Sequence, residues 1–448
     1  MKKIEKFSIF DLFGEYDVAM DLKNEVKIYV GENGLGKTTI LNCLYCVLSG
    51  QINKLLEIDF KKIEIMFEGD SQKYTIDRSD LLKSMKSSKG LDFTFCNPDF
   101  LFKLSPSEMQ KLSTLSVDEV YQLAKNRNFT NAEMMMLLRA ISSRDSLFGD
   151  MNGSKKNKTS RCLQELRRAY SDVEILYFPT YRRIEEDLVK LGGKSDETYF
   201  HNNLLIQFGM HDVEKAIENI LKTINKNAVD GFTQMTGLLL KQYLDGEKLV
   251  GDFNSTEMRI DNEELNIALD RIGNQISEND KAKIKELVNS NDIYDLNNKH
   301  LLNLIRQLIL SYEKQKIYDE KIKKFRDVCN GFLVGKQFVY DESQLKLEIL
   351  KTNTGRTVDL SKLSSGEKQV LSVFSKLYLE EDKQFVILFD EPELSLSMKW
   401  QSHFLTDIFE SGMCKQLIAV THSPFIFDNK FDQFAEDMNN CISEAARE

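Results

Sequence analysis

The sequence predicts an α/β protein with a large helical insertion, and three features of the 448-residue chain lead to that fold class. Strand and helix signals alternate near both ends of the chain. A glycine-rich stretch, GENGLGKTT at residues 31–39, follows an apolar run typical of a buried strand and precedes one typical of a helix. The middle of the chain is long, polar and mostly helical in pattern. Because a domain has about 150 residues, we expect two or three domains.

The order of the remaining elements can be read along the chain. Residues 61–67 and 73–76 alternate between apolar and polar like the two strands of a hairpin. Residues 104–170 have a polar helical pattern, and residues 173–178 form a buried-type strand. Residues 191–335 are helical again. Only five prolines interrupt the chain.

The last helix of this middle region has two possible interpretations. Leu301, Ile305, Leu308 and Tyr312 recur at the spacing of a coiled-coil seam, but over fewer than three heptads. An ordinary helix with one packed face has the same spacing. We favour the packed helix and keep the short coiled-coil arm as the alternative.

The composition indicates a globular protein without a membrane segment. Hydrophobic residues make up 42% of the chain and charged residues 29%, as in ordinary folded domains. No apolar run approaches the roughly 18 residues of a membrane-spanning helix, and the first residues lack the apolar core of a signal peptide. We therefore expect a cytoplasmic protein. The formal net charge of −10 argues against a uniformly basic surface, but it allows a local basic patch.

The glycine-rich stretch matches the phosphate-binding pattern G-x-x-x-x-G-K-[ST] in its expected position between a strand and a helix. Glycines let successive backbone N–H groups point inward, and the helix adds its positive dipole end. Lys37 would reach the β- and γ-phosphates of ATP, and the Thr38 hydroxyl would hold Mg²⁺. We expect nucleotide contacts from Gly31, Asn33, Gly34, Gly36, Lys37, Thr38 and Thr39.

A second stretch, FVILFDEPELSLS at residues 385–397, is an apolar strand that ends in two carboxylates. An acid at the carboxyl end of a parallel strand, beside a phosphate loop, can hold Mg²⁺. Asp390 takes this role in our interpretation. Glu391 would then orient or activate the attacking water.

Two more stretches fit the same site. LSKLSSGEKQ at residues 360–369 places small residues and Gly366 just before a helix, which makes a second anion-binding helix start. QLIAVTHSPF at residues 416–425 is another buried strand, and His422 follows its carboxyl end. A neutral imidazole there could bond the γ-phosphate.

These four stretches, in this order, resemble the motifs of ATP-binding-cassette ATPases: Walker A, signature, Walker B and switch histidine. The stretches DEPELSL, THSPF and LSSGEKQ resemble the corresponding motifs of the branch that contains the RecF, SMC, Rad50 and overcoming-lysogenization-defect ATPases. Lys37 and Ser364 lie 327 positions apart, which leaves room for a helical arm that transporter cassettes lack. The resemblance adds signature contacts to nucleotide from Ser364, Ser365, Gly366 and Glu367.

Within that branch the chain resembles anti-phage defence ATPases, such as the ATPase subunit of the Septu system. The stretches YFPTYRRIE at residues 177–185 and DLFGEYDVAMDL at residues 11–22 carry this closer likeness. It implies two chains paired head to tail, with each signature closing over the ATP of the other chain. No nuclease constellation is evident among the five histidines, so the resemblance implies a separate nuclease partner of the H-N-H type.

The resemblance also implies a domain organisation. Residues 1–103 and 336–448 would form the two lobes of an ATPase head, and residues 171–190 a core strand and loop of that head. Residues 104–170 would be a helical insertion, and residues 191–335 a helical or short coiled-coil arm.

Two departures from the family pattern concern signalling loops. Relatives often have His-Pro after the DEPELSL run, whereas this chain has Ser397 and Met398. The glutamine loop is not obvious, and by position residues 180–183 are the candidate. Arg182 or Arg183 there would touch phosphate or nucleic acid, or would form a surface salt bridge with a neighbouring glutamate.

One segment of the acidic chain is basic. Residues 154–170, SKKNKTSRCLQELRRAY, have six positive charges against one glutamate. Such a patch would contact DNA phosphates without reading bases, or it would be a solvated loop and helix. Its basic residues are Lys155, Lys156, Lys158, Arg161, Arg167 and Arg168.

The sequence leaves two main functional hypotheses. The first is an ATPase subunit of an anti-phage defence complex, whose nucleotide state controls a separate nuclease. The second is a DNA-repair ATPase of the RecF or SMC type that clamps DNA as an ATP-dependent dimer. The long insertion disfavours a third, a transporter motor.

Overall fold

The structure is a computed structural model that describes residues 2–32, 34–70, 72–87, 158–179, 209–245, 259–380 and 383–445. The chain divides into two compact units. Unit 1 comprises Met1–Ile206, Lys383–Leu394 and Cys414–Glu448, and unit 2 comprises Gln207–Asp382 and Ser395–Met413. Residues 336–448 are therefore divided between the two units. Among the described residues, no helix is long and apolar enough to cross a membrane.

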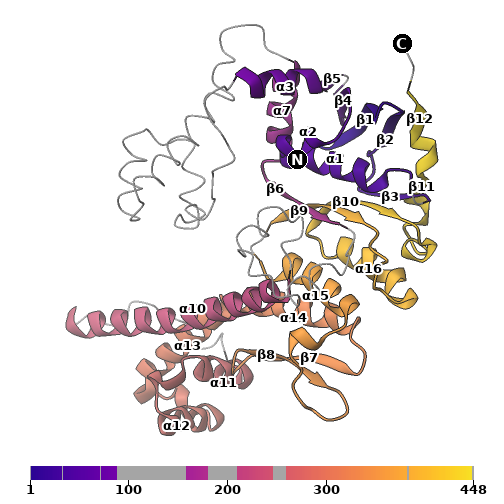
Figure 1. The fold of residues 1–448 in the computed structure, drawn as a ribbon. Coiled ribbons are helices and arrows are strands. Elements are labelled where there is room, and N and C mark those ends of the chain that lie inside the picture. Colours follow the sequence, from indigo (N-terminus) through magenta and orange to yellow (C-terminus); the bar gives the residue numbers. More distant parts are fainter. Residues whose placement is uncertain are drawn as a thin grey trace, which may run out of the picture. The chain divides into compact units, whose positions relative to one another are not determined.

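Unit 1 contains two five-stranded sheets (Figure 1). One is antiparallel, with the strand order β12-β2-β1-β4-β5, and the other is parallel, with the order β11-β3-β10-β9-β6. The antiparallel strands are β1 (Ile4–Leu12), β2 (Tyr16–Asp21), β4 (Lys62–Phe67), β5 (Lys73–Asp77) and β12 (Ile442–Glu444). The parallel strands are β3 (Val26–Val30), β6 (Val173–Phe178), β9 (Gln384–Asp390), β10 (Cys414–Thr421) and β11 (Ala435–Asp437).

The burial of the strands follows their residue pattern. The central strands β9 and β10 are almost continuously apolar and almost continuously buried, as expected for a parallel sheet covered on both faces. In β4, buried and half-buried positions alternate, so this strand has one face in the core. The hairpin predicted at residues 61–67 and 73–76 is confirmed as the antiparallel pair β4–β5. The strand predicted at residues 173–178 is confirmed as β6.

Helix α1 (Lys37–Ser49) joins the two sheets of unit 1 into one core (Figure 1). Its apolar face, including Leu44 and Val47, belongs to the same buried cluster as Phe7 of β1, Ile63 of β4 and Leu388 of β9. The cluster anchors the helix along its length, and the first residue of the helix is Lys37. The other helices of unit 1 are α2 (Ile52–Glu57), α3 (Arg78–Ser87) and α7 (Lys158–Ala169).

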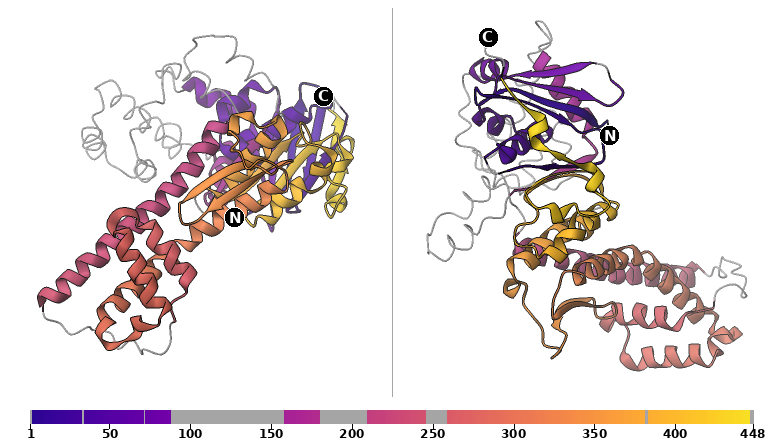
Figure 2. Two further views of the ribbon diagram at one scale, coloured as in Figure 1. Left: turned by 90° about the horizontal axis from the view of Figure 1, so that it is seen from below. Right: turned by 90° about the vertical axis from the view of Figure 1, so that its right-hand side faces the viewer.

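Unit 2 is mainly helical, with one hairpin. In Figure 2 the long helix α10 runs beside the shorter helices of this unit. The helices are α10 (Met210–Asp245), α11 (Asn262–Arg271), α12 (Glu278–Asn289), α13 (Lys299–Glu313), α14 (Lys316–Asn330), α15 (Ser365–Tyr378) and α16 (Met398–Glu410). The hairpin strands are β7 (Lys336–Asp341) and β8 (Lys346–Lys351).

Helix α13 contains the apolar spacing that allowed either a packed helix or a coiled-coil seam. Ile305, Leu308 and Tyr312 are buried, and they share a cluster with Leu265 of α11 and Met235 of α10. Leu301 is half-buried against the same cluster. The packed-helix prediction is confirmed for this segment, because its apolar face packs on two helices of its own unit.

A group of aromatic rings fixes α15 and α16 in unit 2. Phe332 lies just after α14. The distances from its ring centroid to those of Phe374, Trp400 and Phe404 are 5.7, 6.1 and 5.9 Å. Phe332 and Phe374 are both fully buried. These rings hold the signature helix α15 against α16, and they therefore set the position of its N-terminal end.

Candidate functional site

The phosphate-loop pattern lies where strand β3 passes into helix α1. Gly34 and Gly36 have φ values of 92° and 72°, a left-handed conformation that favours glycine. Gly36 is the N-cap of α1, and it gives the helix end no side-chain cap. The first turn contains no acidic residue. The N–H groups of this turn are therefore available to an anion.

Lys37 folds back over this loop. Its Nζ donates to the carbonyl oxygens of Gly31 at 2.7 Å and Glu32 at 2.8 Å, and it lies 2.7 Å from Nε2 of His422. Lys37 is only 5% exposed. Burial lowers the pKa of Lys37, although the nearby carboxylates of Glu391 and Asp390 act in the opposite direction. The ammonium group is thus held in a polar, shielded position at the start of the helix.

The parallel sheet brings the two other motifs to the same edge. Strand β10 lies between β3 and β9, and its residue Val420 pairs with Tyr29 on one side and Asp390 on the other. The ends of the three strands are therefore level, and the residues that follow them meet. Asp390 ends β9 and is 1% exposed.

Glu391 and His422 are in contact at this edge. Oε1 of Glu391 lies 3.2 Å from Nε2 of His422, the nitrogen that also contacts Lys37. Glu391 has a φ of 52°, a conformation that non-glycine residues rarely adopt and that is common at functional sites. Lys37, His422 and Glu391 thus form one connected cluster.

The residues present fit a nucleotide with Mg²⁺. The left-handed glycines and the open helix start suit a polyphosphate, and the exposed Thr38 lies in the first turn of the same helix. Asp390 supplies a buried carboxylate at the strand end. Among the described residues, no group of three or more His, Cys, Asp or Glu side chains could hold a metal by itself. The metal would depend on phosphate oxygens for the rest of its ligands.

The signature stretch in unit 2 starts helix α15 with a capping box. Ser364 is the N-cap, and its N–H and hydroxyl donate to Oε2 of Glu367 at 2.8 and 2.9 Å. Lys336 Nζ lies 2.7 Å from both carboxylate oxygens of Glu367. Burial opposes ionisation of Glu367, but the bonds from Lys336 and Ser364 hold its pKa below the ordinary value. Glu367 therefore completes the capping box at the start of α15, and Lys336 balances its negative charge.

Several predicted residues lie outside the described residues, namely Asn33, Lys155, Lys156, Arg182 and Arg183, together with the glutamine-loop candidate at residues 180–183. Of the basic patch, helix α7 contains the described part. Its Lys158, Arg161, Arg167 and Arg168 are exposed.

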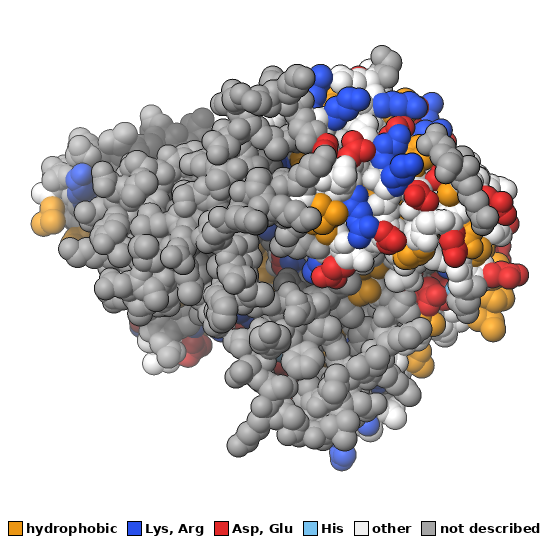
Figure 3. Space-filling view, turned by 45° about the horizontal axis from the view of Figure 1, so that its top comes forward, with side chains coloured by type: hydrophobic (Ala, Val, Ile, Leu, Met, Phe, Trp, Pro, Cys, Tyr) orange, Lys and Arg blue, Asp and Glu red, His pale blue; other side chains and the backbone are white. Residues whose placement is uncertain are grey.

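The exposed arginines of α7 already have local partners. Arg161 donates to the Gln72 side chain at 3.0 Å, and Arg168 pairs with Glu165 at 3.2 Å. On the face drawn in Figure 3, both basic and acidic side chains are visible among the described residues. This part of the surface is therefore mixed in charge rather than uniformly basic.

Two residues of these sites did not emerge from the motifs. Glu393 accepts a hydrogen bond from the backbone N–H of His422 at 2.8 Å, and Lys336 neutralises Glu367. Glu393 could have been suspected from its place two residues after Glu391. Nothing in the sequence links Lys336 to a residue 31 positions away.

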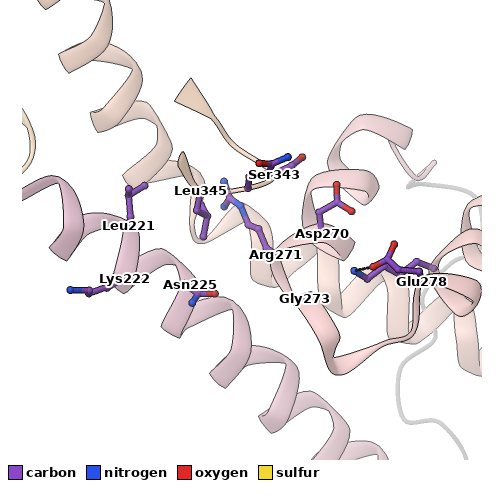
Figure 4. Close-up of a pocket in the computed structure, with 11 residues that line it drawn as sticks. Leu221, Lys222, Asn225, Asp270, Arg271, Gly273, Glu278, Ser343 and Leu345 are labelled. Carbon is purple, nitrogen blue, oxygen red and sulfur yellow. Dashed lines mark hydrogen bonds and ion pairs between the residues drawn. The ribbon is translucent and has the colours of Figure 1, made fainter. Parts of the chain in front are cut away.

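Unit 2 also has an open groove of about 690 Å³ between α10, α11, α12 and the β7–β8 turn (Figure 4). Each cation that lines it has an acidic partner: Lys222 with Glu218, Lys281 with Glu278, and the buried Arg271 with Asp319 at 2.6 Å. The paired charges make this groove part of the scaffold of unit 2, and we assign no chemistry to it.

Comparison with known proteins agrees with the geometry. Residues 210–428 match the family model described as “AAA domain, putative AbiEii toxin, Type IV TA system”. This range contains the signature, Asp390 and His422, and it begins after the phosphate loop. The chain is also 22% identical over 444 residues to the Retron Vc95 probable ATPase of Vibrio cholerae serotype O1 biovar El Tor. The similarity covers 95% of this chain and 71% of that protein.

Similar solved structures include two Smc head domains. One, from Pyrococcus furiosus, has an extended coiled coil and is bound to the C-terminal domain of ScpA; it is 13% identical, with a TM-score of 0.33 and coverage of 95% of this chain and 91% of that chain. A second, bound to the C-winged helix domain of ScpA, is 12% identical, with a TM-score of 0.36 and coverage of 94% and 90%. The sheets and helices described above confirm the predicted α/β fold class. Residues 210–428 are thus similar to an AAA domain, and the chain as a whole is similar to a probable retron ATPase.

Proposed function

We propose that this chain binds ATP with Mg²⁺ at the phosphate loop and hydrolyses it to ADP and phosphate. The observation that carries the proposal is the contact of Lys37 and Glu391 with the same nitrogen of His422. A cation, an acid and an imidazole thus converge at the start of a helix that presents N–H groups to an anion. Phosphoryl transfer to water uses a cation at the phosphates and a residue that orients the attacking water.

Each residue has a distinct task in this proposal. Lys37 contacts the β- and γ-phosphates and balances their charge. Glu391 accepts a proton from the attacking water or orients it, and His422 donates to a γ-phosphate oxygen. Thr38 and Asp390 would hold Mg²⁺, which draws charge from the phosphate oxygens when bound.

We further propose that ATP turnover serves an anti-phage defence complex and controls a separate nuclease subunit. The motif resemblance to defence ATPases supports this role. The related protein is a probable ATPase of the retron Vc95, and the description of the matching family names a type IV toxin–antitoxin system. We take both to favour defence over housekeeping repair. The assignment to a Septu-like complex with an H-N-H partner rests on the motif resemblance alone.

A DNA clamp of the RecF or SMC type is the second candidate. The observation in its favour is the exposed basic side of α7, with Lys158, Arg161 and Arg167. In a clamp, these side chains would contact DNA phosphates without reading bases. The two candidates share the ATP site, and they differ in whether this chain itself holds DNA.

Two substitutions test the ATP site. Glu391→Gln should bind a fluorescent ATP analogue like the parent but hydrolyse ATP at least about a hundredfold more slowly, because the proton acceptor is lost. Lys37→Ala should lose binding itself, because a buried charge that faces the phosphates is removed. Binding and phosphate release are measured on the same preparations.

Matched controls come from exposed residues of the same unit. Glu68→Gln and Lys61→Ala change the same residue types on the surface of unit 1, and both should leave binding and turnover unchanged. The proposal is wrong if Glu391→Gln hydrolyses ATP at the parental rate, or if Lys37→Ala binds the analogue as tightly as Lys61→Ala.

A further inference from the structure

The end of strand β10 connects three parts of the ATP site through three consecutive residues. Two of the connections are hydrogen bonds between backbone groups, which many sequences could make. The third uses a side chain as acceptor. In chain order, they join the Val420 carbonyl to the Glu391 N–H at 2.9 Å, the Thr421 carbonyl to the Gly31 N–H at 3.3 Å, and the His422 N–H to Oε1 of Glu393 at 2.8 Å.

The chain reverses at residues 391–394 to bring Glu393 to this position. The N–H of Leu394 donates to the carbonyl of Glu391 at 3.2 Å, which closes a turn. Glu391 opens the turn with its φ of 52°, a strained conformation that surrounding contacts must offset. The bond from His422 to Glu393 is one of those contacts. It ties the turn that contains the water-activating acid to the loop that contains the histidine.

The position of the His422 peptide decides where its ring lies. Nε2 of the ring is 2.7 Å from Lys37 Nζ and 3.2 Å from Oε1 of Glu391. A small movement of the peptide would break one or both contacts, because hydrogen bonds weaken steeply beyond normal distances. The Glu393 side chain restrains this peptide because it accepts the His422 N–H.

We propose that Glu393 is a positioning residue of the ATP site, which acts by holding the His422 peptide. The expected effect on turnover rests on the proposed function. The hydrogen bond between the His422 N–H and Glu393 is independent of that function. Glu393 performs this task with an acceptor oxygen, which a glutamine side chain also has. Glutamine should therefore replace it, whereas alanine should not. Glu391 is expected to behave in the opposite way, because its task requires a proton acceptor.

The first test reads the contact without any nucleotide. The chain has five histidines, so protein labelled with ¹⁵N-histidine gives few amide signals, and the His422 signal is the one lost in His422→Gln. Hydrogen exchange of this amide should be slow in the parent and in Glu393→Gln, and at least about tenfold faster in Glu393→Ala. Equal exchange in all three proteins would overturn the proposal. Glu68→Ala is the control for loss of an exposed carboxylate.

The second test reads turnover. Glu393→Ala should lower kcat about tenfold or more and leave nucleotide affinity within about threefold, and Glu393→Gln should stay near the parent. In a His422→Ala background, Glu393→Ala should add no further loss, because both changes remove the same contact. The positioning role would be overturned if Glu393→Gln lost as much turnover as Glu393→Ala. It would also be overturned if the losses of turnover in Glu393→Ala and His422→Ala added up in the double variant. If instead the parent hydrolyses ATP no faster than Lys37→Ala, the proposed function fails, and amide exchange still decides the role of Glu393.

Discussion

Gly366 in the signature helix lies directly against the backbone of Ser395, within unit 2. A Cβ atom on Gly366 would overlap the carbonyl oxygen of Ser395, and it would lie 3.3 Å from the ring of Trp400. Ser395 itself has a φ of 69°. Glycine at this position therefore permits the loop after the DEPEL run to pack on the start of α15, in addition to any role in binding an anion.

Gly366→Ala should destabilise unit 2. The added methyl group meets backbone that cannot move away as a flexible side chain would, so we expect a loss of about 1–3 kcal/mol in unfolding free energy. Trp400 is the only tryptophan of the chain, and its fluorescence reports on this contact during urea unfolding. Gly237→Ala is the matched control, because nothing lies within 4 Å of a Cβ there and α10 should gain up to about 1 kcal/mol. Equal unfolding midpoints for parent and Gly366→Ala would contradict the prediction.

Lys336→Met should remove the charge that neutralises Glu367. The Glu367 side chain is 4% exposed, so its carboxylate would be left buried and poorly compensated. We expect a loss of about 1–3 kcal/mol in unfolding free energy at neutral pH. Lys362→Met is the control, because Lys362 and Asp359 form an exposed pair that contributes about 0–1 kcal/mol.

This loss should depend on pH with a definite sign. The pKa of Glu367 in the folded chain is below its ordinary value of 4.5, so the ionised group stabilises the parent above that pH. The contribution disappears as the pH falls through the lowered pKa. The difference in stability between parent and Lys336→Met should therefore be full at neutral pH and should shrink in acid. A difference of equal size at both ends of the range would contradict this account.

The parts of the site that follow from local sequence were predictable. Asp390 ends the apolar strand β9, His422 directly follows the apolar strand β10, and Lys37 follows the glycine-rich loop after strand β3. Parallel strands end at the same edge of a sheet, so the sequence predicts that these residues meet. Contacts between distant segments were not predictable. Strand β12 pairs with β2 through Ile442 and Val18, which are far apart in the chain and have no pattern in common.

The side-chain contacts within a motif could not be predicted from the sequence either. The spacing of DEPEL does not tell which carboxylate faces which partner, because the turn at residues 391–394 depends on the unusual φ of Glu391. In the same way, the buried pair of Arg271 and Asp319 requires α11 and α14 to pack first. Such pairs depend on tertiary packing, and local propensity does not determine that packing.

Reversing the charges of the basic patch should separate the two candidate functions. A variant with Glu at Lys155, Lys156, Arg161, Arg167 and Arg168 should bind DNA more weakly, alone or in its complex, and with a flatter dependence on salt. ATP affinity should stay near the parent. Binding is measured at several salt concentrations. Unchanged DNA binding would favour the interpretation of the patch as a solvated loop and helix, and it would weaken the clamp hypothesis.

Complementation between two inactive chains should test whether an ATP site is shared. In the dimer that the motif resemblance implies, Ser364 closes over the nucleotide that Lys37 of the opposite chain holds. Lys37→Ala and Ser364→Arg should each be inactive alone. A mixed pair has both defects in one site and leaves the other site intact. Random mixing in equal amounts should then restore about a quarter of the parental turnover, if each site works independently in a two-fold pair.

The competing arrangement gives a different result in the same experiment. If Lys37 and Ser364 of one chain served the same nucleotide, every chain in the mixture would have one defect, and no turnover would return. If the Ser364→Arg chain alone hydrolysed ATP at the parental rate, the shared-site arrangement would also be wrong. Adding the Lys37→Ala chain to a second Lys37→Ala preparation is the control, because no pairing of these chains creates an intact site. Recovery only in the mixture would establish that ATP lies between two copies of the chain, and its hydrolysis could then open the pair and release a bound partner.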